Sequence, residues 1–265
     1  MTPCTRRAAL LLLPSLLAGA KAAQAQVPRV GVVLMHGAAA RSDSMAGLAG
    51  RLRQAGHLVA NLDMPWSSEV AHRVPVESAE RQVMAGLHDL RRRGAQKVVL
   101  AGFSKGGMFA AYMATRTPVD GLVAIAPNGG ADQKRLKDEV ARARALVAAG
   151  RGEEPTLLHD GDVTGDGRYP IPNAVPSAYV TWFDPQGALN FERIFRSQRP
   201  GMPVLLVVPT RDLENLLRVK DQVWRGLPPH PGHRLHEPAT DHLGAVTHSE
   251  QEAVRWIAEV VQHGS

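Results

Sequence analysis

Residues 98–107 read VVLAGFSKGG, an apolar run followed at once by a serine set between glycines. The run Val98–Ala101 has the length and composition of a strand buried on both faces, as in a parallel sheet. Gly102 and Gly106 stand two residues before and two residues after Ser104. A serine on a sharp corner between a strand and a helix needs small neighbours, because its backbone is strained there. The alternative interpretation is an ordinary tight turn.

The segments on either side alternate short apolar runs, which predict strands, with longer amphipathic runs, which predict helices. The expected strands are 30–35, 57–62, 97–101, 121–126, 202–208 and a short sixth at 233–236. The expected helices are 45–55, 76–93, 105–115, 131–149, 213–223 and 252–261. Strands that alternate with helices in this way predict an α/β fold, a mostly parallel, doubly wound sheet flanked by helices.

The stretch 128–200 interrupts this alternation. Beyond its charged helix it is rich in Gly, Asp and Pro, so we expect a loop there. The stretch as a whole is expected to form a cap-like or lid-like insertion over the carboxyl edge of the sheet. Its aromatic side chains suit either a substrate pocket or packing of the insertion on the sheet, and we favour packing: Tyr169, Tyr179, Trp182 and Phe183.

Two patterns raise the possibility of a metal, and we expect none. Residues 162–167 read DVTGDG, like the first half of a calcium loop, but Asn173 stands where that loop has a bidentate acid. We therefore favour a polar turn. His230, His233 and His236 are three residues apart, so on a strand they would face opposite sides, and no acidic or cysteine partner completes a zinc set.

The N-terminus predicts a secretory signal peptide over 1–25, with a mature domain over 26–265. Arg6 and Arg7 precede a short apolar stretch, which leads to the small residues Ala-Gln-Ala at 23–25. The paired arginines also suit a twin-arginine signal, so the export route is Tat-like or Sec. We expect a periplasmic or secreted protein with no stable membrane span after cleavage. An uncleaved anchor is the alternative.

The charge balance argues against a nucleic-acid partner. The chain has 31 basic and 25 acidic residues. The predicted leader contains Arg6, Arg7 and Lys21 and no acid, which leaves 28 against 25, a net charge of +3. No element carries the clustered basic residues of a nucleic-acid surface. The single cysteine, Cys4, lies in the leader, so the mature chain has no thiol and no disulfide.

The stretch Gly102-Phe103-Ser104-Lys105-Gly106, taken with the order of elements over 28–262, resembles the α/β-hydrolase family of esterase-like and lipase-like serine hydrolases. The resemblance implies that Ser104 is a nucleophile and that an acid and then a histidine follow it along the chain. It implies no cofactor.

The acid that this order implies is Asp212, which follows the strand 202–208, and Glu214 is the alternative. The implied histidine is His242, on a loop before the last helix. His248 is less favoured, because it precedes a predicted capping box of Ser249 and Glu252 that would begin this helix.

The family also implies an oxyanion hole made of backbone N–H groups. One donor is carried over to Lys105, the residue after the serine. The other is carried over to Ala38, and less firmly to Gly37, on the loop after the first strand. His36 is expected to brace that loop.

The function implied is hydrolysis of a carboxylic ester of a small-molecule acyl substrate through an acyl-enzyme. The ester is an expectation by analogy of fold, and amide, thioester and lactone substrates stay open. The alternative from another class is a non-catalytic secreted binding or accessory protein on the same fold.

Overall fold

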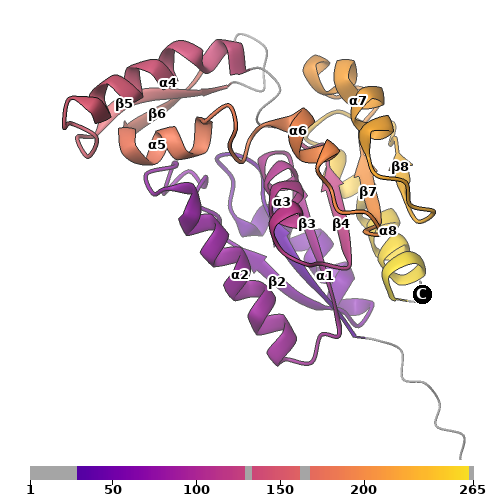
Figure 1. Ribbon diagram of the computed structural model, residues 1–265. Helices are drawn as coiled ribbons and strands as arrows, with labels where there is room; N and C mark the ends of the chain where they lie inside the picture. Colours follow the sequence, from indigo (N-terminus) through magenta and orange to yellow (C-terminus); the bar gives the residue numbers. More distant parts are fainter. Residues whose placement is uncertain (1–28, 129–132, 162–167, 263–265) are drawn as a thin grey trace, which may run out of the picture.

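The computed structural model describes residues 29–128, 133–161 and 168–262 (Figure 1). The predicted signal peptide, 1–25, and the calcium-like loop, 162–167, lie outside the described residues. Within the described ranges, no helix is long and apolar enough to cross a membrane.

A six-stranded sheet forms the centre of the molecule, and every neighbouring pair of its strands is parallel. Its order is β2-β1-β3-β4-β7-β8. The strands are β1 (Val30–Met35), β2 (Leu58–Leu62), β3 (Lys97–Phe103), β4 (Gly121–Ile125), β7 (Val204–Val207) and β8 (Arg234–His236). The predicted parallel sheet is confirmed, and the expected strands coincide with these six to within a few residues.

Helices cover both faces of the sheet, as predicted for a doubly wound fold. One face packs against α1 (Ala46–Gln54), which follows the short 3₁₀ helix η1 (Ser42–Met45), and against α8 (Ala245–Trp256), which ends in a π-helical segment, η2 (Ile257–Gln262). The other face packs against α2 (Val76–Arg92) and α3 (Lys105–Arg116). The short α6 (Phe191–Arg196) contacts α3 and α7 (Glu214–Gly226).

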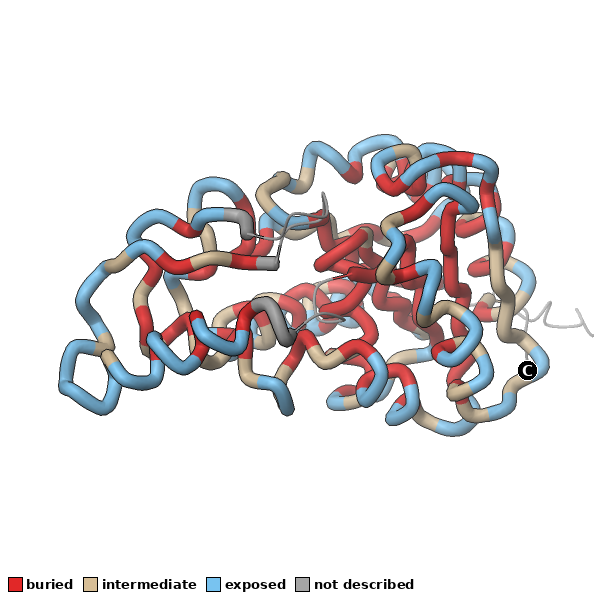
Figure 2. Tube along the Cα trace, turned by 90° about the horizontal axis from the view of Figure 1, so that it is seen from above, coloured by how far each residue is buried: buried red, intermediate tan, exposed pale blue. Residues whose placement is uncertain are grey.

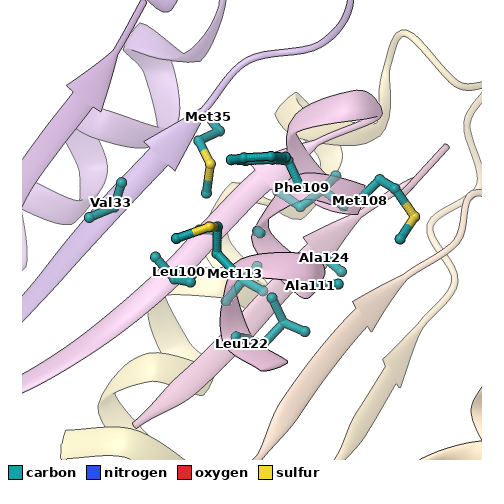
Figure 3. Close-up of a cluster of buried hydrophobic side chains, with 14 of the residues drawn as sticks. Val33, Met35, Leu100, Met108, Phe109, Ala111, Met113, Leu122 and Ala124 are labelled. Atoms are coloured by element: carbon teal, nitrogen blue, oxygen red, sulfur yellow. The ribbon is translucent and has the colours of Figure 1, made fainter. Parts of the chain in front are cut away.

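The hydrophobic core lies between the central strands and these helices. Figure 2 shows that buried positions gather in the sheet and in the faces of the helices turned toward it. Figure 3 shows the part of the core under α3, where side chains of β1, β3 and β4 meet the apolar face of that helix. The labelled residues are Val33, Met35, Leu100, Met108, Phe109, Ala111, Met113, Leu122 and Ala124. This packing fixes the end of β3 and the start of α3.

Between β4 and β7 the chain leaves the sheet and forms a separate lobe, here called the cap, beyond one end of it (Figure 1). The cap consists of α4 (Gln133–Ala148), β5 (Thr156–Gly161), β6 (Arg168–Ala174) and α5 (Pro176–Phe183). The expected loop after the first helix is wrong, because β5 and β6 form an antiparallel hairpin in which Pro170 pairs with His159. Proline is tolerated because β6 has only one neighbouring strand in the described residues.

The last helix begins at Ala245, about two turns before the predicted start at residue 252. Gly244 occupies its N-cap position. Ser249 lies inside the helix, where its hydroxyl donates to the carbonyl of Ala245, and Glu252 pairs with Arg234. The predicted capping box is therefore wrong. Ala245 and Val246 are buried, and their burial favours a helix that starts directly after the His242 loop.

Candidate active site

The corner between β3 and α3 has a strained backbone at Ser104, with φ 53° and ψ −118°. Its N–H donates to the carbonyl of Ile125 (2.9 Å), and its carbonyl accepts from Met108 (3.0 Å) and Asn128 (3.1 Å). A left-handed conformation of this kind persists only where the surroundings hold it. These three hydrogen bonds hold the corner from β4 and from α3.

The glycines around Ser104 are required by space. A Cβ atom on Gly102 would lie 2.3 Å from the carbonyl carbon of Gly106, and one on Gly106 would lie 2.3 Å from the carbonyl oxygen of Met35. Both atoms belong to the backbone, so neither can move aside as a side chain would. The glycines therefore let the first turn of α3 pack directly against the ends of β1 and β3.

Three side chains from three strand ends meet at this corner. Ser104 follows β3, Asp212 comes shortly after β7, and His242 lies between β8 and α8. His242 Nδ1 is 2.7 Å from Asp212 Oδ1, and His242 Nε2 is 3.1 Å from Ser104 Oγ. All three residues are buried. The structure thus brings together the serine, the acid and the histidine that the sequence predicted, at the carboxyl edge of the sheet.

The structure shows which of the two candidate acids, Asp212 or Glu214, contacts His242. Asp212 Oδ1 also accepts from the N–H of Leu213 at 2.6 Å, which orients the carboxylate toward the histidine. Glu214 is the first residue of α7 and its side chain is exposed. Because the helix begins between the two residues, only Asp212 faces His242.

His242 is held in one orientation by its two polar neighbours and by a ring. A carboxylate only accepts hydrogen bonds, so Nδ1 donates to Asp212 and Nε2 accepts from Ser104. The ring of Phe103 packs on it with the centroids 5.0 Å apart. His248 does not lie at this site. It is exposed on α8, where its Nδ1 lies 2.9 Å from the carbonyl oxygen of Gly244.

The loop after β1 lies against the same corner. A Cβ atom on Gly37 would be 3.4 Å from the Cβ of Ser104 and 3.0 Å from the ring of Phe103. The N–H groups of Ala38 and Lys105 donate to no acceptor within the described residues. Lys105 is the first residue of α3, where N–H groups have no partner in their own helix.

His36 braces this loop, as expected. Its Nδ1 donates to the carbonyl of Gly37 (2.8 Å), and its Nε2 accepts from the N–H of Met64 (2.8 Å). Its carbonyl accepts from the indole N–H of Trp66. Burial is the main cause that lowers the pKa of His36 from 6.5, which keeps the ring neutral and able to accept.

The two histidines just before β8 are engaged in local structure, whereas within the described residues the buried Nε2 of His236, in β8, has no hydrogen-bond partner. His233 Nδ1 accepts from Val204 N, and its Nε2 donates to the carbonyl of Pro228. His230 accepts from the N–H of Gly232. Throughout the part of the chain that the structure describes, no three His, Cys, Asp or Glu side chains are grouped as metal ligands would be.

The aromatic residues at the end of α5 pack the cap onto the core. Tyr179, Trp182 and Phe183 are buried. The Trp182 ring lies 5.8 Å from the ring of Trp66, and its N–H donates to the carbonyl of Val74. Packing was the favoured interpretation, and for these three residues it is confirmed.

Sequence reasoning missed a polar cluster next to Ser104. The side chain of Lys105 is buried and contacts Asp160 of β5 and His72 of the loop after β2. One signal was present in the sequence. Lys105 is a charged residue in the first, tightly packed turn of a helix whose next residues are apolar, so its ammonium group requires a partner. No local pattern marks Asp160 or His72.

The fold and the strand-end arrangement of serine, histidine and aspartate define this chain as a protein with the α/β-hydrolase fold. No protein-family profile and no curated protein matches the sequence.

Three solved structures illustrate the likeness. A monoacylglycerol lipase from Paleococcus ferrophilus is 22% identical, with 89% of this chain and 95% of that chain covered and a TM-score of 0.63. A thermostable carboxyl esterase from Bacillus coagulans is 15% identical, with 89% and 92% covered and a TM-score of 0.62. An α/β hydrolase from a Penicillium species is 15% identical, with 88% and 91% covered and a TM-score of 0.65. The fold is thus shared over nearly the whole chain.

Proposed function

We propose that the protein is an exported serine hydrolase that cleaves a carboxylic ester. The observation that carries the proposal is the hydrogen-bonded row of Asp212, His242 and Ser104, which ends on the strained corner at β3. The row has the geometry of an acid that orients a base and a base that activates a nucleophile.

In the proposed first half-reaction, Ser104 Oγ attacks the acyl carbon while His242 Nε2 takes the hydroxyl proton. Negative charge develops on the former carbonyl oxygen, and the N–H groups of Lys105 and Ala38, with Gly37 as the alternative, stabilise it. The tetrahedral intermediate expels the alkoxide, which receives the proton from His242 and leaves as an alcohol. Asp212 stabilises the imidazolium and preserves the tautomer.

In the second half-reaction, water attacks the acyl-enzyme and gives one proton to His242. The intermediate releases the carboxylic acid, and Ser104 Oγ recovers the proton. All groups needed for both steps are side chains or backbone groups of this chain, so the proposal requires no cofactor and no metal.

The proposal of an ester, and of a small-molecule acyl substrate, rests on analogy. Proteins of the same fold include a lipase and a carboxyl esterase, and an enol-lactonase from Burkholderia xenovorans has a TM-score of 0.53. A site that forms an acyl-enzyme also accepts amides, thioesters and lactones in principle, so comparing turnover of matched ester, thioester, amide and lactone substrates tests this step.

A fluorophosphonate probe tests the enzyme directly, because it phosphonylates only an activated serine. We expect a stoichiometric adduct on Ser104, and no adduct in Ser104→Ala or after heat denaturation. Folded wild-type protein that takes up no probe would favour the alternative, a non-catalytic secreted binding protein.

Export is a separate part of the proposal and rests on residues 1–25. We expect protein recovered from the periplasm or medium of a bacterial host to begin at Gln26. Mass spectrometry of the intact protein measures this, and an uncleaved leader would contradict it. Replacing Arg6 and Arg7 by lysine separates the routes, because the twin-arginine route requires the pair.

A further inference from the structure

Lys105 has a buried side chain next to the nucleophile, and only 3% of that side chain is exposed. Its ammonium group forms an ion pair with the carboxylate of Asp160. It also lies 3.0 Å from His72 Nε2 and 5.4 Å from the centre of the Phe183 ring. A buried charge is tolerated only when it is paired and hydrogen-bonded, and this one is both.

His72 acts as a neutral acceptor in this cluster. Burial, and then the charge of Lys105, hold the pKa of His72 well below 6.5, so Nε2 accepts a hydrogen bond from the ammonium group. The loop presents the ring with strain, because Ala71 and His72 both have positive φ angles, 48° and 58°. Its backbone is bonded in turn to Ser67 and Pro65.

The cluster joins two parts of the molecule at one residue. Asp160 belongs to β5 of the cap, whereas the backbone of Lys105 begins α3 and directly follows Ser104. Two other polar contacts join the cap to the start of α2 and to the residue two positions before it, and neither includes Lys105. Thr181 accepts from the N–H of Val76 (2.9 Å), and Trp182 donates to the carbonyl of Val74 (2.7 Å).

We propose that Lys105 is a positioning residue whose ion pair with Asp160 holds the first turn of α3 beneath the cap. This inference rests on the proposed function, in which the N–H of Lys105 stabilises the oxyanion. Because the side chain of Lys105 is anchored to the cap, the backbone of Lys105 is restrained from rotating. The direction of its N–H group is thereby fixed. The cap therefore acts on the transition state through Lys105.

Asp160→Asn tests the inference, with Thr181→Val as the matched control that removes a cap contact in which Lys105 takes no part. The readouts are kcat and KM on p-nitrophenyl acetate, whose small acyl group needs little of the cap, and the inhibition constant of a trifluoromethyl ketone, which mimics the tetrahedral intermediate. We expect Asp160→Asn to lower kcat by about 10- to 100-fold, less than the full loss of an oxyanion donor. KM should change by less than about threefold, since only transition-state binding is weakened. Ketone affinity should fall in step with kcat.

A second variant, Lys105→Met with Asp160→Asn, covers the case in which the single change prevents folding. Removing both charges of a buried pair is often nearly neutral for stability, so this variant should melt close to wild type and still show the reduced kcat. If it recovers wild-type kcat and ketone affinity, the ion pair only balances charge and the inference is wrong. An equal loss of kcat in Thr181→Val also overturns it.

The two proposals fail differently. Wild-type protein that takes up no fluorophosphonate overturns the serine hydrolase and the role of Lys105 together. Wild-type labelling with unchanged kinetics in Asp160→Asn overturns the role of Lys105 alone.

Discussion

Ser104 has a backbone conformation that belongs to glycine. Its angles, φ 53° and ψ −118°, are close to those of the first central residue of a type II′ turn, which is normally Gly. Strain of this kind costs about 1–3 kcal/mol. The conformation places the buried side-chain oxygen 3.1 Å from His242 Nε2, where the proposed reaction requires a serine.

An alanine variant is usually more stable than a glycine variant, and at Ser104 this order of stability should be inverted. We expect Ser104→Gly to be more stable than Ser104→Ala by about 1 kcal/mol, because glycine relieves the strain and alanine keeps it. Urea denaturation of both variants measures the difference. Alanine as the more stable variant would mean that the corner is not strained.

The acid position gives a second prediction at this scale. Asp212→Asn should leave the protein folded and lower kcat by several orders of magnitude, on the order of 10⁴ as in another serine triad. An amide at this position favours the tautomer of His242 that has a proton on Nε2, and such a ring cannot accept the serine proton. Steady-state kinetics and circular dichroism measure the two expectations.

Glu214→Asn is the matched control, since it removes a negative charge two residues away from an exposed position. It should change kcat by less than about threefold. A large loss in this variant with little loss in Asp212→Asn would assign the acid to Glu214.

Among single residues, those that follow strand ends could be predicted. The glycines around Ser104, and the order of serine, acid and histidine, are local patterns with a known structural setting. The contact of Lys105 with Asp160 could not be predicted, because it joins residues 55 positions apart on two different lobes. Nothing near Asp160 in the sequence indicates burial of its carboxylate.

At the scale of elements, α3 depends on close approach to the ends of two strands. Gly106→Ala should destabilise the protein by more than about 3 kcal/mol, because the added carbon meets backbone atoms of Met35 and His36 at 2.3 to 2.6 Å. Thermal unfolding of purified protein, or loss of soluble protein on expression, measures this.

Gly50→Ala in α1 is the control for that change. No atom lies within 4 Å of the added carbon, and alanine is the better helix former, so this variant should be more stable by about 0.5–1 kcal/mol. Equal stability of the two variants would show that the start of α3 can shift away from β1.

Helices and strands could be predicted from the sequence where apolar residues recur at a regular spacing on one face, and less well elsewhere. The six parallel strands and the helices that cover them follow from burial patterns. The hairpin of β5 and β6 was missed because Pro170 and Pro172 argue against a strand, an argument that fails for a strand with one neighbour. The start of α8 was misplaced because Ser249 matches a capping pattern, whereas burial of Ala245 extends the helix past it.

At the scale of the whole molecule, buried neutral histidines make stability depend on pH. Burial is the largest cause that lowers the pKa of each of four histidines from 6.5: His36, His57, His72 and His233. In the unfolded chain these rings take up protons as pH falls through about 6.5, and in the folded chain they do so only at lower pH. The unfolded state then binds more protons, so stability is present above about pH 6.5 and is lost below it.

We expect the free energy of unfolding to fall as pH is lowered from 7.5 to 5.5, with each such histidine contributing up to about 1.4 kcal/mol per pH unit. His72→Gln should reduce this slope by roughly one histidine's share, and His248→Gln, at an exposed position, serves as the control. Urea unfolding at several pH values measures the slopes. The same slope in wild type and His72→Gln would mean that His72 is protonated in the folded state.

The placement of Ser104 and His242 also has a consequence for when activity arises during biosynthesis. The two residues are 138 positions apart, so at about 5–20 residues per second the ribosome adds the histidine roughly 7 to 28 seconds after the serine. Neither residue acts alone in the proposed reaction, and α8 must also dock to hold the His242 loop. Under the proposed function, a nascent or truncated chain is therefore inert toward esters. Hydrolytic capacity would then belong only to the finished chain.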